Sequence, residues 1–70
     1  MCSSVGAVSE TVRAELAASA EAVDRYRQRI AGLIDTLGKD SEDLASAMYE
    51  AERALLSAHR LLVRAEKIAK

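Results

Sequence analysis

The sequence predicts an all-α protein built as an antiparallel two-helix hairpin, and two observations carry this prediction. Apolar residues recur at alternating steps of three and four through most of the 70 residues, which places one apolar stripe along a helix. The stripe is interrupted once, at the Gly38-Lys39-Asp40 segment near mid-chain. The chain contains no proline, so no pyrrolidine ring breaks either periodic stretch.

The first helix is expected over residues 8–37. We assign the heptad letter a to its most regular apolar series, which consists of Leu16, Val23, Ile30 and Leu37. The d positions that alternate with this series are Val5 and Val12, which precede it, and Ser19, Tyr26 and Leu33. Gly6 is expected to loosen the start of this helix, and Gly32 costs it about 1 kcal/mol relative to alanine.

The second helix is expected over residues 41–69, after a turn at residues 38–40. Gly38 suits the position that follows a helix end, where a left-handed backbone is common. Asp40 or Ser41 can cap the next helix, and Glu42 and Asp43 complement the positive end of its dipole. Its a residues are Met48, Leu55 and Leu62, and its d residues are Leu44, Ala51, Ala58 and Ala65. A connection this short makes the helices antiparallel.

Residues beside the stripe predict the register of the hairpin. The e positions are Arg13, Ala20, Arg27 and Ile34 on the first helix, and Ala45, Glu52, His59 and Glu66 on the second. In an antiparallel pair e faces e, and the turn is centred on Lys39. The opposed pairs are then Arg13–Glu66, Ala20–His59, Arg27–Glu52 and Ile34–Ala45. Two pairs join opposite charges and none joins like charges, which selects this register although each exposed pair contributes less than about 1 kcal/mol.

The contact between the helices is expected to join the a residues of the first helix to the small d residues of the second. A branched residue opposite an alanine in every heptad allows an interaxial distance nearer about 8 than 10 Å. The predicted intrachain seam consists of Leu16, Val23, Ile30, Leu37, Ala51, Ala58 and Ala65.

The second helix carries more apolar surface than one neighbouring helix can cover. The predicted partner interface consists of Tyr49, Leu56, Leu61, Val63 and Ile68. An apolar strip of this length with charged borders marks an interaction surface, and two hairpins that bury such strips form a four-helix bundle. A homodimer is favoured, a heteromeric protein partner is the first alternative, and a marginally stable monomer is the second.

Size and charge restrict the remaining possibilities. Seventy residues with two tyrosines as the only aromatic residues form one thin domain. Such a core rarely contributes more than about 3–5 kcal/mol without a disulfide, a metal or a partner. Cys2 is the only cysteine, which excludes an internal disulfide. A net charge of −1 gives no electrostatic basis for binding nucleic acid.

The sequence also bears on location. No segment approaches the roughly 20 uninterrupted apolar residues of a membrane span, so membrane insertion is not expected. Residues 1–6 have neither the basic region nor the long apolar region of a secretory signal peptide. Cytoplasmic synthesis is therefore expected, and export without a cleaved signal peptide stays open. The abundance of alanine and the preference for arginine over lysine are typical of a GC-rich bacterial genome.

No residue pattern predicts catalysis or a cofactor. A two-helix hairpin has no concavity of its own to hold a small-molecule substrate. His59 is the single histidine and lacks a second ligand at helical spacing, so no metal is expected. The sequence contains no glycine-rich phosphate loop, no Cys-x-x-Cys pair and no Ser/His/Asp set. The chain is therefore interpreted as a protein without enzymatic activity.

The segment Thr36-Leu37-Gly38, between two antiparallel helices, resembles the turn of the W-x-G family of small type VII secretion substrates and their adaptor relatives. Thr36 stands at the place of the family's tryptophan, and Arg53 stands where its export signal has an acidic residue four positions after a tyrosine. The resemblance covers the architecture of the whole chain and the glycine of the motif. It implies an association with a type VII-like secretion pathway.

The functional prediction is a helical protein–protein interaction module that serves as an adaptor, a chaperone or an assembly subunit. The alternative is a small antitoxin or regulatory subunit that binds a partner enzyme. A gene for a secretion ATPase or secreted toxin nearby would favour the first function. A toxin gene immediately adjacent would favour the second.

Overall fold

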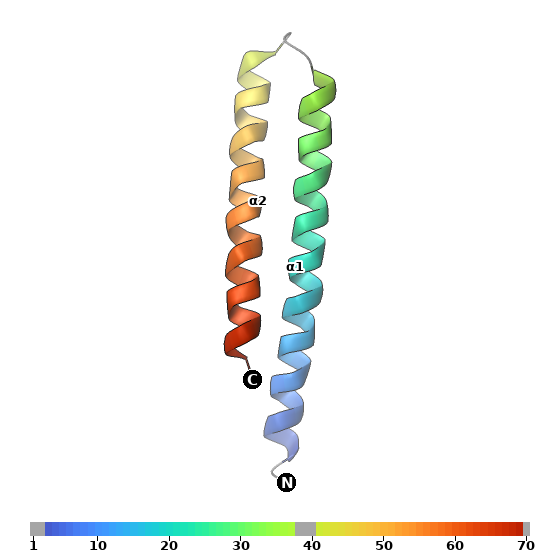
Figure 1. Cartoon of the computed structure of the whole chain (residues 1–70), viewed down its shortest axis with the longest axis vertical. Helices are drawn as coiled ribbons and strands as arrows, with labels where there is room; N and C mark the ends of the chain where they lie inside the picture. The colour runs from blue at the N-terminus through green and yellow to red at the C-terminus, as the bar shows by residue number, and fades with distance from the viewer. Residues whose placement is uncertain (1–2, 38–40, 70) are drawn as a thin grey trace.

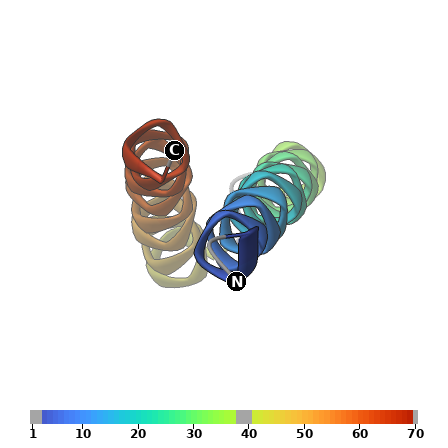
Figure 2. The same ribbon diagram turned by 90° about the horizontal axis from the view of Figure 1, so that it is seen from below.

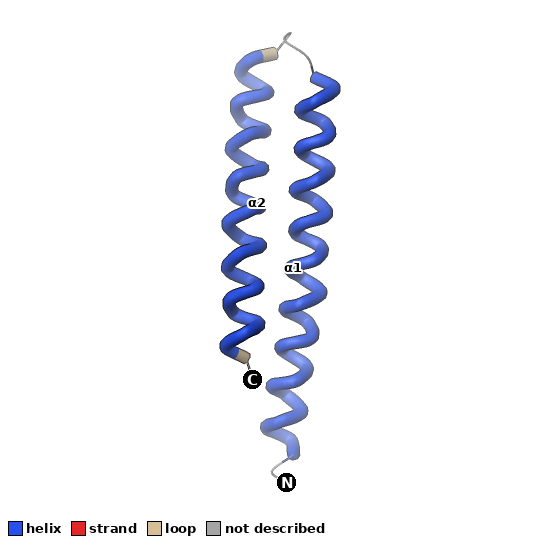
Figure 3. Tube along the Cα trace, in the orientation of Figure 1, coloured by secondary structure: helices blue, strands red, loops and turns tan. Residues whose placement is uncertain are grey.

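The computed structural model describes the backbone of residues 3–37 and 41–69, and the side chains of residues 9–37 and 41–69. Helix α1 spans Ser3–Leu37 and helix α2 spans Glu42–Ile68. The two helices lie side by side and run in opposite directions (Figure 1), and they account for nearly all of the described chain (Figure 3). The predicted all-helical hairpin is confirmed. The expected turn at residues 38–40, including Gly38, lies outside the described residues.

The helix ends differ slightly from the expected ones. Helix α1 begins at Ser3 instead of near residue 8, because a single glycine such as Gly6 weakens a helix by only about 1 kcal/mol and does not end it. At the other helix, Ser41 occupies the N-cap position without a side-chain capping bond. Its carbonyl accepts the N–H of Ala45 at 2.9 Å. Glu42 and Asp43 lie in the first turn of α2, as predicted.

Two long-range contacts establish the register. The Nδ1 atom of His59 lies 3.0 Å from the backbone oxygen of Ala20, and the Nη1 atom of Arg27 lies 3.8 Å from Oε2 of Glu52. These are two of the four predicted e–e pairs, so the predicted register is confirmed. The described residues contain no ion pair between Arg13 and Glu66, the other charged pair that this register opposes.

The seam between the helices is centred on the e residues, which corrects the predicted centre between a and d. Among the described side chains, Ala20 and Ile34 are the buried apolar ones, at 4% and 9% exposure, and both are e residues. Ala51 was expected in the seam but is exposed. The other predicted seam residues are only partly buried; they are Leu16, Val23, Ile30, Leu37, Ala58 and Ala65.

The rotation of the seam has a physical reason in the composition of α2. This helix is apolar on both sides of its e residues, with Leu55 and Leu62 on one side and Leu56 and Val63 on the other. A seam centred on the e residues partly covers both sides, and all four leucine and valine side chains are intermediate in exposure. The polar e residues Arg27, Glu52 and His59 make contacts across the seam, which offset the cost of their partial burial.

The hairpin is a rod with a single layer of two helices. Its Cα extents are 60 × 14 × 12 Å, and the view along the rod shows the helices next to each other with no third element over them (Figure 2). Each helix is therefore covered along one side only. Neither helix, over the described residues, combines the length and hydrophobicity of a membrane-spanning segment.

Candidate interaction surface

The rotated seam leaves the a and d stripe of both helices on one side of the hairpin. The helices are antiparallel and their e residues face each other. A heptad position that lies to one side of e on α1 therefore lies on the same side of the hairpin on α2. The a residues flank the seam there, and the d residues lie next to them, farther from it. We call this side the apolar face, and its exposed large residues are Val12, Tyr26, Leu33, Leu44, Leu61 and Ile68.

Exposure increases toward the outer edge of the apolar face. Val12, Leu33 and Leu44 are about half exposed, whereas Leu61 and Ile68, at the outer edge of α2, reach 63% and 71%. The described part of the chain has seven exposed large apolar residues, and six of them belong to this face or its edge. Exposed large apolar residues gathered on one side of a small protein make that side a candidate interaction surface.

The structure places the residues of the predicted partner interface on two different sides of the hairpin. Leu61 and Ile68 lie at the edge of the apolar face and are exposed. Leu56 and Val63 lie on the opposite side of the seam and are partly buried, so they contribute to the hairpin itself. Tyr49 also lies on that opposite side and is 58% exposed. The structure therefore does not gather the five residues on one surface.

Sequence reasoning missed most of the apolar face because it assigned the a and d residues to the intrachain seam. The signal was present in the e residues. Ala20 and Ile34 are apolar, and Arg27 and Glu52 can neutralise each other, so this line is as able to form a seam as the a and d stripe. Helix α2 is apolar on both sides of its e residues, and the charge register alone does not say which side packs against α1.

A polar cluster lies where the two helices meet near mid-length. The Nε–H of Arg27 donates to Oδ1 of Asp24 at 3.0 Å, and the amide of Gln28 donates to Oδ2 at 3.0 Å. Arg27 also approaches Glu52 across the seam. The Arg27 hydrogen bond is the main reason why the pKa of Asp24 lies below its ordinary 3.8. Partial desolvation opposes this shift, and the charge of Arg27, the charge of His59 and the Gln28 bond support it.

The stability of the hairpin should therefore depend on Asp24 at acid pH. A carboxyl whose pKa is lower in the folded chain stabilises the fold above its unfolded pKa, and this contribution disappears as the pH falls through the folded pKa. The melting-temperature difference between the native chain and Asp24→Asn should be constant above about pH 5 and should shrink below about pH 4. In an Arg27→Met background this pH dependence should be largely lost. An unchanged pH dependence in that background would contradict the role of Arg27.

His59 has a structural role in the seam. The short distance from its Nδ1 atom to the Ala20 oxygen requires a proton on Nδ1, because a carbonyl oxygen only accepts hydrogen bonds. Among the described residues, no group of three or more His, Cys, Asp and Glu side chains is placed to hold a metal ion. The geometry accounts for His59 as a link between α1 and α2.

Two surface depressions of the described chain contain no catalytic arrangement. One is lined by Ala22, Arg25, Tyr26 and Arg29 of α1, and the other by Tyr49, Glu52, Arg53 and Leu56 of α2. Each is formed by a single helix and is open to the outside. Neither combines a nucleophile with a base at hydrogen-bond distance, which acid–base or nucleophilic catalysis requires.

Comparison of the chain with models of protein families, with curated proteins and with solved structures found no match. The resemblance of Thr36-Leu37-Gly38 to the W-x-G turn therefore stays a prediction from the sequence. The geometry of the apolar face is the observation from which a function can be inferred.

Proposed function

We propose that this chain is a helical protein–protein interaction module without enzymatic activity, which buries its apolar face against a second helical hairpin to form a four-helix bundle. The observation that carries the proposal is the apolar face, whose exposed large residues are d residues of both helices together with Leu61 and Ile68 at the edge of α2. In a four-helix bundle each helix contacts two neighbours, and the directions from its axis to these two neighbours differ by about a right angle. The e residues supply the first contact, and the d residues supply the second.

The accessible surface of the hairpin supports this proposal. The chain exposes 5585 Å², whereas a compact monomer of 7.5 kDa exposes about 4,200 Å². The excess of about 1,300 Å² is larger than the roughly 800 Å² that each partner buries in a standard protein interface. Part of the excess follows from the rod shape of the single hairpin.

The proposal also covers the biological setting of the module. Adaptor, chaperone and assembly-subunit roles all use a surface of this kind, since each requires a stable contact and no reaction. An association with type VII-like secretion rests on the resemblance of the turn segment alone.

The two tyrosines provide a matched test of the proposed face. Tyr26 is 57% exposed on the apolar face, and Tyr49 is 58% exposed on the opposite side. Tyr26→Glu should place a charge in the contact and weaken the complex at least about 30-fold, as expected for a central interface residue. Tyr49→Glu should leave the complex unchanged. Both variants should keep the helical circular-dichroism spectrum, because neither side chain is buried in the hairpin.

Sedimentation at micromolar concentration and co-purification of a tagged chain from the native cell would measure this complex. A native chain that sediments as a monomer and also purifies alone would overturn the proposal. Loss of the complex in Tyr49→Glu but not in Tyr26→Glu would show that the opposite side binds the partner, and would overturn the assignment of the face.

A further inference from the structure

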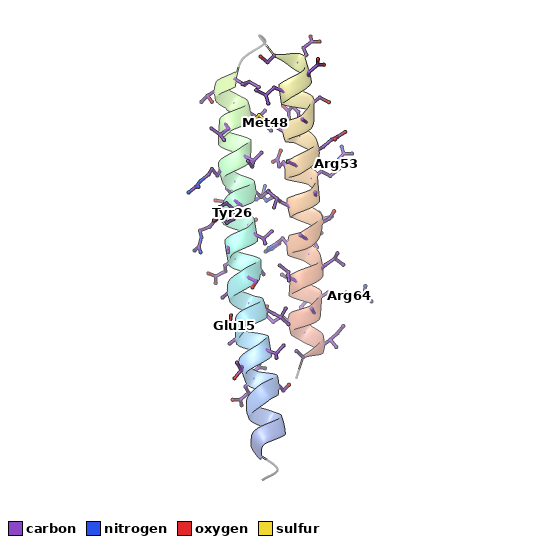
Figure 4. All side chains as sticks on the ribbon, turned by 180° about the vertical axis from the view of Figure 1, so that it is seen from behind. Glu15, Tyr26, Met48, Arg53 and Arg64 are labelled. Atoms are coloured by element: carbon purple, nitrogen blue, oxygen red, sulfur yellow. The ribbon has the colours of Figure 1, made fainter. Side chains whose placement is uncertain are left out.

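The two outer edges of the apolar face differ in chemistry. Along each helix the g residues come after the d residues, on the side away from the seam. On α1 they are Glu15, Ala22, Arg29 and Thr36, and on α2 they are Ala47, Ala54, Leu61 and Ile68. The α1 edge thus carries one negative and one positive charge, both exposed, and the α2 edge is entirely apolar. Glu15 projects from the outer side of α1, whereas Met48, an a residue, lies between the helices (Figure 4).

We propose that the apolar face binds a second copy of this chain about a two-fold axis perpendicular to the helices. In this arrangement α1 lies against α1 of the second copy and α2 lies against α2 of the second copy, each pair antiparallel. The proposal rests on the proposed function, and it names the partner and its orientation.

The charges of the α1 edge fit this arrangement. Glu15 and Arg29 are each seven residues from Ala22. A two-fold axis at the height of Ala22 therefore brings Glu15 opposite Arg29 of the second copy, and Arg29 opposite Glu15 of the second copy. Ala22 then faces its own equivalent, where a small side chain allows the two helices to approach closely.

The side-chain sizes of the α2 edge fit the same arrangement. Ala54 and Leu61 lie at nearly equal distances from Ser57 along the chain, and so do Ala47 and Ile68. A two-fold axis at the height of Ser57 brings Leu61 opposite Ala54 of the second copy, and Ile68 opposite Ala47. Large residues then meet small ones, and the two most exposed apolar side chains of the described chain become buried.

The register of the hairpin places the axis inferred from α1 and the axis inferred from α2 at the same height along the rod. Ala20 is opposite His59 in the structure, so Ala22 is at the height of Ser57, two residues away on each antiparallel helix. The centre found from charges on α1 and the centre found from sizes on α2 therefore coincide. The two edges share no residues, so each supports the arrangement independently.

The other way to place two apolar faces together uses a two-fold axis parallel to the helices. It puts α1 against α2 of the second copy, and so places Glu15 beside Leu61 and Arg29 beside Ala47 of that copy. Both charges then lie against the apolar edge of α2, and opposite charges are found only farther from the contact, at Arg64 and Glu50 of that copy. Glu15 and Arg29 therefore lose more water for a more distant partner than in the perpendicular arrangement. The chemistry of the edges favours the perpendicular axis for this reason.

Charge reversal on the α1 edge tests the orientation. Arg29→Glu puts like charges together twice in the perpendicular arrangement and should raise the dimer dissociation constant by between about 2-fold and 30-fold. The double variant Glu15→Arg, Arg29→Glu restores both opposite-charge pairs and should return the dissociation constant to within about threefold of the native value. A double variant that binds as weakly as the single one, or more weakly, would overturn the perpendicular arrangement.

Distances between spin labels provide a second test. In a Cys2→Ser background, labels would be attached at Glu42→Cys, near the turn, or at Ser57→Cys, near the proposed axis. At 1.5 Å rise per residue the perpendicular axis separates the two Glu42 positions by about 45 Å, while the Ser57 labels stay within about 25 Å. A parallel axis keeps both distances below about 25 Å, and that result would overturn the proposal.

These outcomes separate the identity of the partner from the proposed function. A chain that is monomeric alone but co-purifies with another protein through Tyr26 would overturn the second-copy proposal and leave the interaction module in place. A dimer with a long Glu42 distance and a short Ser57 distance would support both.

Discussion

Ala20→Leu is expected to lower the free energy of unfolding by about 1–3 kcal/mol, the usual cost of overpacking a filled contact. Ala20 is the most buried apolar residue of the described chain, at 4% exposure, and its backbone oxygen bonds to His59. A leucine there would push the helices apart and lengthen this bond. Urea unfolding followed by circular dichroism measures the change.

Ala51→Leu is the matched control for Ala20→Leu, because it adds the same atoms to the other helix at an exposed position. It should change the unfolding free energy of the monomeric hairpin by less than about 0.5 kcal/mol. Equal destabilisation by the two variants would contradict a seam centred on the e residues and would favour one centred between a and d.

Ile34→Ala should lower the free energy of unfolding by about 2–4 kcal/mol, because it removes one of the few buried large side chains and leaves a cavity. Ile34 is 9% exposed, whereas the neighbouring Leu33 is 49% exposed on the apolar face. A hairpin this small has about 3–5 kcal/mol from its core, so the monomeric Ile34→Ala chain should be partly unfolded at 25 °C.

Comparison of Leu33→Ala with Ile34→Ala distinguishes the proposed contact between hairpins, which involves Leu33, from the intrachain seam, which contains Ile34. The loss caused by Ile34→Ala should be present at every protein concentration, since the intrachain seam does not depend on association. The loss caused by Leu33→Ala should be small in dilute solution and should grow with concentration as the bundle forms. Concentration-dependent melting curves of both variants measure this difference. Identical behaviour would place both residues in the same contact.

Much of the hairpin could be predicted from the sequence. The three-four spacing predicts the helices, and the opposite charges of Arg27 and Glu52 predict the register that their contact confirms. The rotation of the seam could not be predicted, because two apolar sides of α2 compete for one neighbour. The a and d stripe, which has the more regular spacing, is then left on one side of the hairpin. Its residues are therefore not the ones closest to the other helix.

The start of α1 and the content of the polar cluster show two other limits of sequence reasoning. Propensity alone does not place a helix end within a few residues, and α1 extends through Gly6 to Ser3. Asp24 and Gln28 drew no attention in the sequence because each is an ordinary surface residue. Their importance follows from their place beside Arg27, which contacts Glu52 across the seam, and only the packed helices define that contact.

The unequal lengths of the two helices have a dynamic consequence. Helix α1 has 35 residues and α2 has 27, so the first two turns of α1 extend past the end of α2 (Figure 1). Helical segments this short are marginal in water without tertiary contacts. Backbone amides there should exchange their hydrogens with solvent far faster than those beside Ala20. In the perpendicular dimer the second of these two turns lies along the last turn of α1 in the second copy, so association should slow the exchange of its amides.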